Sequence, residues 1–185
     1  MTRHRAVHRA ALAALVSLSA LVAASGCASD GGDDGGDAGD DSDDGGGGSP
    51  CGPSSGRVAR VIDGDTIQLE SGERIRYLLV DTPENTTEVE CFGPEATEFN
   101  TELVEGAEVE LDYDEECTDF YDRTLAYVTV QDREVNSLLV ERGFGCALYI
   151  PPNGADRRDE FESLQAQARA ARRGLWAACS ENPCN

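Results

Sequence analysis

The sequence predicts one small α+β domain, compatible with a closed β-barrel, in the last two thirds of the chain. Five short apolar segments separated by turn residues lie between residues 57 and 130. One helical pattern lies between the third and fourth segments, and two more follow the fifth. Short strands with few, late helices are typical of α+β folds, and 185 residues leave room for a single domain.

The first 27 residues have the pattern of a secretory signal. Arg3, Arg5 and Arg9 precede an apolar stretch at residues 10–24, which is too short for a permanent membrane span. The ending "ASGC" resembles a bacterial lipobox, which would make Cys27 the lipidated first residue of the mature protein. An ordinary signal with an incidental cysteine is the alternative.

The residues after Cys27 predict a disordered tether. Residues 28–50 contain only Gly, Asp, Ser, Ala and one Pro, so they cannot bury apolar surface. A calcium-binding Asp-Gly repeat is the alternative, but its spacing is irregular. Ala28 and Ser29 lack the Asp associated with inner-membrane retention in some bacteria, which favours an exported protein anchored at the outer membrane or cell surface. The expected divisions are a signal (1–27), a tether (28–56), a functional domain (57–178) and a cysteine-containing tail (179–185).

Cysteine, histidine and charge limit the possible chemistry. Beyond Cys27 six cysteines remain, which favours up to three disulfides in any of 15 connectivities in an exported protein. Both histidines lie in the signal, so a mature mechanism works without histidine. After residue 50 the chain has 28 acidic residues, 12 arginines and no lysine. Such a surface repels polyanions at long range and argues against nucleic-acid binding through a basic face.

The expected elements follow from turn residues and periodicity. The turn "DGD" separates strands at 57–62 and 66–70, and Ser71-Gly72 leads into a third strand at 73–80. A helix begins near Pro94 and ends before Gly106. Strands are expected at about 108–113 and 124–130. Helices follow at about 134–142 and 155–173, each ending at a glycine.

Carboxylates stand where these strands end. If Ser71-Gly72 forms a tight hairpin, Asp65 returns to the same end of the ladder as Asp81. Two converging carboxylates need a proton or a cation between them, and hard oxygen ligands suit Ca²⁺ or Mg²⁺. The alternative is that "DGD" is only a turn and Asp81 only a cap.

Two arginines and a glutamate accompany these acids. Arg76 lies inside an otherwise hydrophobic strand, and Arg123 precedes the fifth strand. An arginine offers a planar fork of donors that matches phosphate oxygens, although each could instead be a surface ion-pair residue. A metal, two arginines and Glu84 are the parts needed for attack of water on a phosphodiester.

The motifs "VIDGDT", "RYLLVDTPE", "FGPEA", "TDFYDRTLAYV" and "GLW" occur in this order over about residues 57–177. In this arrangement the sequence resembles the staphylococcal nuclease (thermonuclease) family. The resemblance implies a five-stranded OB-fold-like β-barrel with about three α-helices. It also implies a Ca²⁺ cofactor held by Asp65, Asp81 and the main-chain oxygen of Thr82.

The resemblance assigns the remaining roles as well. Glu84 would be the general base or would orient the attacking water, and Arg76 and Arg123 would bind the scissile phosphate. Tyr121 would hydrogen-bond a phosphate. The segment "GCALYIPPN" is similar to the family's substrate-stacking loop, which makes Tyr149 a candidate for contacting a base or phosphate.

The implied reaction is calcium-dependent, sequence-nonspecific cleavage of single-stranded or frayed DNA and RNA by a monomer, giving 3′-phosphate ends. Asp122 stands where the family usually has Gly, and Phe120 where a basic residue is common, so substrate binding is expected to be weaker or more salt-tolerant. One alternative is a catalytically weak or inactive OB-fold nucleic-acid-binding surface lipoprotein. A calcium-stabilised surface protein without a nucleic-acid role is another, but it leaves the two arginines unexplained.

Overall fold

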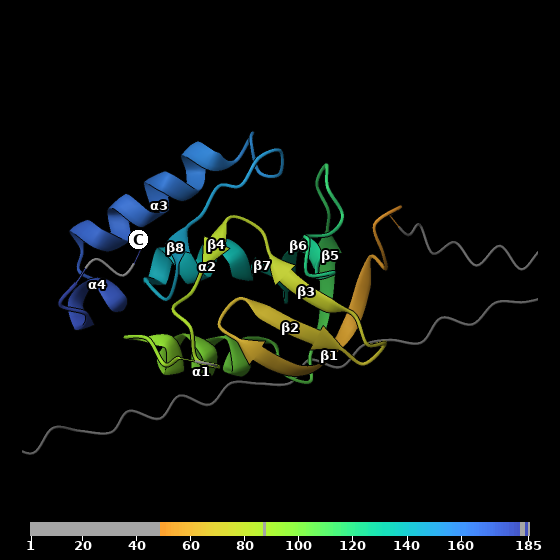
Figure 1. The fold of residues 1–185 in the computed structure, drawn as a ribbon, viewed down its shortest axis with the longest axis horizontal. Helices are drawn as coiled ribbons and strands as arrows, with labels where there is room; N and C mark the ends of the chain where they lie inside the picture. The colour runs from red at the N-terminus through yellow and green to blue at the C-terminus, as the bar shows by residue number, and fades with distance from the viewer. Residues whose placement is uncertain (1–48, 87, 182–183, 185) are drawn as a thin grey trace, which may run out of the picture. The chain divides into compact units, whose positions relative to one another are not determined.

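The computed structural model describes residues 49–86, 88–181 and 184. Five of its strands form a closed barrel, in which each strand pairs with the next in the order β3-β2-β1-β5-β6 and β6 runs parallel to β3 to close the ring (Figure 1). This confirms the expected α+β barrel. These strands are β1 (Ser55–Asp63), β2 (Thr66–Leu69), β3 (Arg74–Tyr77), β5 (Glu108–Asp112) and β6 (Thr124–Val130).

Strand β1 belongs to both halves of the barrel. Its first residues, Ser55 to Arg57, pair with β5, and its later residues pair with β2. Two register shifts interrupt the β1–β2 ladder, and such irregularities bend a strand strongly enough to close a small barrel. The residues that point inward from the five strands are buried and apolar: Val58, Ile67, Leu69, Ile75, Tyr77, Val109, Leu111, Ala126, Val128 and Val130.

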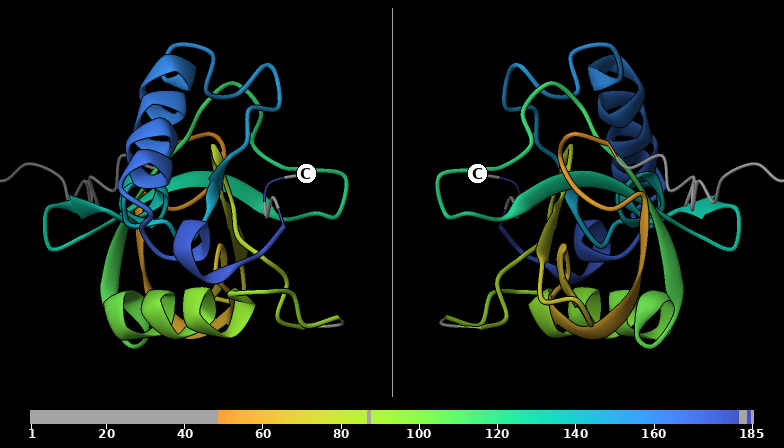
Figure 2. Two further views of the ribbon diagram at one scale, coloured as in Figure 1. Left: turned by 90° about the vertical axis from the view of Figure 1, so that its left-hand side faces the viewer. Right: turned by 90° about the vertical axis from the view of Figure 1, so that its right-hand side faces the viewer.

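Three longer helices cover the barrel. Helix α1 (Gly93–Val104) lies against β1, while α2 (Val135–Arg142) packs between β6 and α3 (Arg158–Ala170) (Figures 1 and 2). Helix α3 begins three residues later than expected because residues 154–157 form a turn. A one-turn helix, α4 (Leu175–Ala178), and a short strand, β7 (Arg133–Glu134), had no clear sequence signal.

The third expected strand, residues 73–80, is broken in the structure. Strand β3 ends at Tyr77, Leu79 adopts a left-handed conformation (φ 61°), and β4 (Val80–Asp81) pairs with β8 (Cys146–Ala147) instead. The side chain of Arg76 fills the bend, where its Nη1 donates to the main-chain oxygens of Tyr77 (2.8 Å) and Val80 (2.6 Å). The guanidinium group of Arg76 therefore supplies hydrogen bonds to main-chain oxygens at the point where the strand is interrupted.

The six cysteines after Cys27 form three disulfides: Cys51–Cys117, Cys91–Cys179 and Cys146–Cys184. Residues 49–56, expected to end the tether, already contact the barrel through the first of these and through β1. The expected signal and most of the expected tether lie outside the described residues. Within the described part of the chain, no helix has the length and apolar character needed to cross a membrane.

Candidate active site

Asp65 is buried at the end of the β1–β2 turn. Its main-chain oxygen accepts a hydrogen bond from Tyr77 N (2.9 Å), and the β2–β3 register pairs its neighbour Thr66 with Arg76. Only 4% of Asp65 is exposed. Its Oδ2 accepts hydrogen bonds from the main-chain N–H (2.8 Å) and the hydroxyl (3.1 Å) of Thr82. The hairpin thus brings this carboxylate to the segment that follows β4.

Arg76 lies between the two expected metal-binding carboxylates. Its Nε is 3.1 Å from Asp65 Oδ1, and its Nη2 is 2.8 Å from Asp81 Oδ1. The Arg76 side chain is 11% exposed and that of Asp65 6%, whereas the Asp81 side chain is 56% exposed. The arginine is therefore held rigidly from the barrel side, while Asp81 faces solvent.

A third carboxylate, Asp63, belongs to the same cluster. Its Oδ1 accepts a hydrogen bond from Asp65 N (3.2 Å). Burial and the neighbouring Asp65 charge raise the pKa of Asp63 to about 6. Desolvation and the Asp65 charge also raise the pKa of Asp81, although Arg76 opposes this shift. The acids thus carry repulsion that a bound cation would relieve.

Two glycines allow the close approach of the segment that carries Glu84. A Cβ on Gly64 would lie 2.6 Å from the Thr82 hydroxyl, and a Cβ on Gly93 would lie 2.3 Å from the main-chain oxygen of Glu84. The same oxygen accepts a hydrogen bond from Glu90 N (2.9 Å), and Glu84 N donates to the Glu90 carboxylate (2.9 Å). The Glu84 backbone is therefore fixed while its carboxylate remains exposed.

Arg123 is held by Asp119 within the loop between β5 and β6. Asp119 Oδ2 is 2.7 Å from both Nε and Nη2 of Arg123, and its Oδ1 accepts from the main-chain N–H groups of Tyr121 (2.9 Å) and Arg123 (3.0 Å). Partial burial alone would raise the pKa of Asp119, but these hydrogen bonds hold it below its ordinary value. The other terminal nitrogen of Arg123, Nη1, makes no hydrogen bond to the described residues.

These side chains line one polar pocket of about 120 Å³. Its wall contains every residue expected to hold metal or to act in catalysis: Asp65, Arg76, Asp81, Thr82, Glu84 and Arg123. Asp63 and Pro83 complete the wall. They come from the β1–β2 turn, β3, the segment after β4, and the β5–β6 loop. The pocket combines hard oxygen acceptors with two guanidinium groups, the chemistry that suits a divalent cation and a phosphate together.

An apolar cleft of about 330 Å³ adjoins this pocket and shares Arg76 and Arg123 with it. Leu79, Leu125 and Leu148 line it, and the largely exposed Phe120 (86%) and Ile150 (65%) lie at its edge. An apolar surface beside paired cationic groups can receive the flat face of a base whose phosphate lies at the arginines.

The model for the family described as Staphylococcal nuclease homologue matches residues 74–178. The chain belongs to the staphylococcal nuclease family. It is 38% identical over 125 residues to a thermonuclease of Staphylococcus intermedius, an alignment that covers 64% of this chain and 74% of that protein. It is also 34% identical over 125 residues to the endonuclease YncB of Bacillus subtilis (strain 168). That alignment covers 64% of this chain and 59% of YncB.

The two tyrosines expected to bind substrate in this nuclease-family domain lie in different surroundings. Tyr121 is 60% exposed, and the Arg123 guanidinium lies over its ring at 5.4 Å. Tyr149 lines neither pocket; its ring packs against the core and beneath Arg158 (5.2 Å). Its chain neighbours Leu148 and Ile150 line the cleft instead, because successive residues of an extended segment point to opposite sides.

Sequence reasoning missed the residues that position the nuclease site. Asp119 lies four residues before Arg123 inside the motif "TDFYDRTLAYV", but the motif alone does not show that its carboxylate holds the arginine. Asn100 accepts a hydrogen bond from Tyr77 Oη (3.0 Å) and donates one to Asp63 O (3.3 Å), and Asn136 binds three main-chain groups of the barrel. Asn100 and Asn136 are both fully buried. An Asn at an apolar position of a helix is therefore the sequence signal that could have identified them.

Proposed function

We propose that this protein hydrolyses phosphodiester bonds in DNA and RNA with calcium dependence and without sequence specificity, leaving 3′-phosphate ends. The observation that carries the proposal is the gathering of Asp65, Asp81, Glu84, Arg76 and Arg123 around one pocket in a member of the staphylococcal nuclease family. A single-stranded or frayed substrate fits the adjoining apolar cleft, because a base must be unpaired to enter it.

The acids of the pocket fit a calcium ion by their chemistry. No group of three His, Cys, Asp or Glu side chains arranged to bind a metal occurs among the described residues. The proposed ligands are two carboxylates, Asp65 and Asp81, and the main-chain oxygen of Thr82, so such a group is not required. All three are hard oxygen donors, and burial together with the charge of Asp65 raises the pKa of the adjoining Asp63, so added positive charge at this pocket would be favourable. When bound, the ion would neutralise charge on the phosphate.

The two arginines would bind the scissile phosphate. Asp119 orients the Arg123 fork through Nε and Nη2, which leaves Nη1 for a phosphate oxygen. Arg76 is fixed by Asp65 and Asp81 and adds a second positive charge at the same pocket. Because both guanidinium groups are positioned before substrate arrives, they can stabilise the charge that develops in the transition state without reorganising.

Glu84 would take a proton from the attacking water. The water oxygen forms a bond to phosphorus, the bond from phosphorus to the 5′-oxygen breaks, and the 5′-oxygen leaves as a hydroxyl after taking a proton from solvent water. The fragment on the 5′ side of the cut keeps the phosphate on its 3′-oxygen, and the fragment on the 3′ side begins with the new 5′-hydroxyl. The Glu84 backbone is fixed by its hydrogen bonds to Glu90 and lies close to Gly93, which supports this role because a general base must lie within hydrogen-bond reach of the water.

The location of the protein is also a proposal. The signal pattern at residues 1–27 and the lipobox-like "ASGC" support export and a lipid on Cys27, with the residues between Cys27 and the barrel as the tether of a monomeric nuclease domain. Outer-membrane or cell-surface attachment is favoured by Ala28 and Ser29. Metabolic labelling with a radioactive fatty acid tests it: the wild-type chain should be labelled and Cys27→Ser should not.

Digestion of single-stranded DNA and RNA with calcium, magnesium or chelator tests the reaction. Cleavage should require calcium and should fall at least 100-fold in Glu84→Gln and Arg123→Ala, because each removes a group that acts in the transition state. Glu98→Gln and Arg142→Ala, on exposed helix positions, are the matched controls and should cleave normally. Wild-type protein that binds DNA without cutting it would instead support the nucleic-acid-binding alternative.

A further inference from the structure

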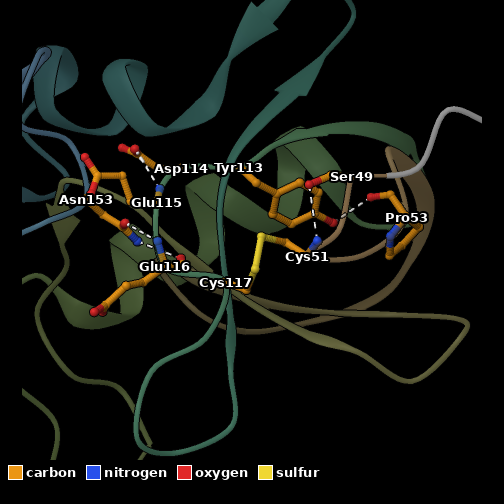
Figure 3. Close-up of a disulfide and its surroundings, with 9 residues drawn as sticks. All are labelled: Ser49, Cys51, Pro53, Tyr113, Asp114, Glu115, Glu116, Cys117 and Asn153. Carbon is orange, nitrogen blue, oxygen red and sulfur yellow. Dashed lines mark hydrogen bonds between the residues drawn. A yellow bond between two sulfur atoms is a disulfide. The ribbon is translucent and has the colours of Figure 1, made fainter.

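The loop between β5 and β6 carries Arg123 but is not held by the barrel alone. We call residues 113–123 the arginine loop. Asp119 organises its second half, as described above. Its first half crosses the space between the chain that precedes β1 and the segment after β8 (Figure 3). The position of Arg123 therefore depends on what fixes this first half.

On one side, Asn153 holds the arginine loop. Asn153 is 4% exposed; its Nδ2 donates to Glu116 O and its Oδ1 accepts from Glu116 N, both at 2.8 Å. Gly154 N donates to the Asp114 carboxylate (2.6 Å). Figure 3 shows Asn153 facing the main chain at Glu116. These hydrogen bonds fix residues 114–116 to the segment that also lines the apolar cleft.

On the other side, the Cys51–Cys117 disulfide holds the loop (Figure 3). Cys117 stands two residues before Asp119, and its main-chain oxygen accepts a hydrogen bond from Leu125 N (2.9 Å) in β6. Cys51 lies just before β1, where Tyr113 Oη donates to Pro53 O (2.6 Å). The disulfide is thus the covalent link between the start of the barrel and the stem of the arginine loop.

Both sulfur-bearing residues are half-buried and neither is fully enclosed, so a small reductant can reach them. The strands of the barrel close through their own hydrogen bonds and buried core, independently of this bond. Opening the bond therefore removes the covalent tie between the loop and residues 49–53 while leaving the barrel folded. The hydrogen bonds from Asn153, Gly154 and Leu125 remain, so the stem of the loop is loosened and not detached. Besides the disulfide, the Tyr113–Pro53 hydrogen bond joins residues 49–53 to the loop, whereas the bonds from Cys51 N to Ser49 Oγ (3.2 Å) and from Gly52 N to Ser49 O (3.2 Å) stay within the segment.

We propose that the Cys51–Cys117 disulfide is a redox switch of the nuclease activity, an inference that rests on the proposed function. With the bond formed, Asp119 and Arg123 are held at the phosphate pocket. A dithiol reductant transfers two electrons and two protons to the bond; the sulfur–sulfur bond breaks, two thiols form, and the dithiol becomes its own disulfide. The reduced enzyme is folded but less active, so its activity is low in a reducing compartment and rises after oxidation.

A double variant, Cys51→Ser/Cys117→Ser, isolates this bond because the other two disulfides remain. Its kcat/KM on single-stranded DNA should be about tenfold lower than that of the oxidised wild type, less than the loss of 100-fold or more expected without Arg123. In an Arg123→Ala background the same two substitutions should change kcat/KM less than twofold, because the group that the loop positions is already absent. Equal losses in both backgrounds, or none in either, would overturn the proposal.

Hydrogen exchange gives a readout that does not depend on activity. Main-chain amides of residues 113–123 should exchange faster in the double variant, whereas those of β2 and β3 should not change. If the oxidised wild type fails to cleave, the proposed function fails while this measurement still tests the loop. If the double variant does not fold, wild-type protein titrated with dithiothreitol replaces it, with the opened disulfide identified by mass spectrometry. Unchanged exchange in the loop when Cys51–Cys117 is open would refute the switch.

Discussion

Asp63→Asn should stabilise the metal-free protein at neutral pH. The pKa of Asp63 is raised from 3.8 to about 6 by burial and by the charge of Asp65. The folded state therefore binds the proton more tightly than the unfolded state, and stability falls as pH rises from about 4 to about 6. The shift corresponds to a cost of about 3 kcal/mol at pH 7. Asn removes this charge but keeps the acceptor for Asp65 N, so we expect a gain of about 2–3 kcal/mol.

Urea unfolding in chelator at pH 7 and pH 4 measures this gain. At pH 4 the wild-type carboxyl is already protonated in the folded state, so the difference between the two proteins should shrink to about 0.5 kcal/mol. Glu98→Gln, which removes one charge from the exposed face of α1, is the control and should change stability little at either pH. An Asp63→Asn gain that is the same at both pH values would refute the electrostatic reasoning.

Three further predictions concern residues that position the site. Asn136→Ala should lower the free energy of unfolding by about 3 kcal/mol, because three buried hydrogen bonds to main-chain groups are lost; a urea midpoint near that of wild type would contradict this. Gly93→Ala should reduce kcat about tenfold or more, since the new Cβ displaces the Glu84 main chain, and an unchanged kcat would show that the displacement is harmless. Asp119→Asn should lower kcat/KM about tenfold by weakening the hold on Arg123. In an Arg123→Ala background it should have no further effect, and additive losses in that double-mutant cycle would argue against a positioning role.

The residues after position 50 carry an excess of acids. They can still form a site for phosphate because carboxylates hold two arginines at the pocket. Arg76 and Arg123 each lie between or against carboxylates that fix their direction. A phosphate that reached the pocket would meet two guanidinium groups held in place by carboxylates, although the chain as a whole carries an excess of acids. Salt screening limits the range of the remaining repulsion to about 8–10 Å.

Much of the site was predictable because it depends on short-range rules. The "DGD" turn and the hairpin after β2 place Asp65 beside the end of β3 by strand geometry, whereas Asp81 comes close to it only through the bend at Leu79. The surroundings of Tyr149 are set by tertiary pairing, because which face of its segment turns toward the cleft depends on the pairing of β4 with β8. The break at Leu79 that makes this pairing possible depends on hydrogen bonds from Arg76, and neither follows from periodicity.

The sequence by itself determined the fold class, the succession of strands and helices, and the residue types able to bind a cation and a phosphate, because these follow from local periodicity, turn chemistry and motif order. Only the tertiary structure decided that Asp119 holds Arg123, that Asn100 and Asn136 tie helices to the barrel, and which of 15 disulfide connectivities forms. These contacts join residues that lie far apart in the chain or meet only where a loop folds back on itself. Such proximity is set by packing and barrel closure, and it leaves no local pattern in the sequence.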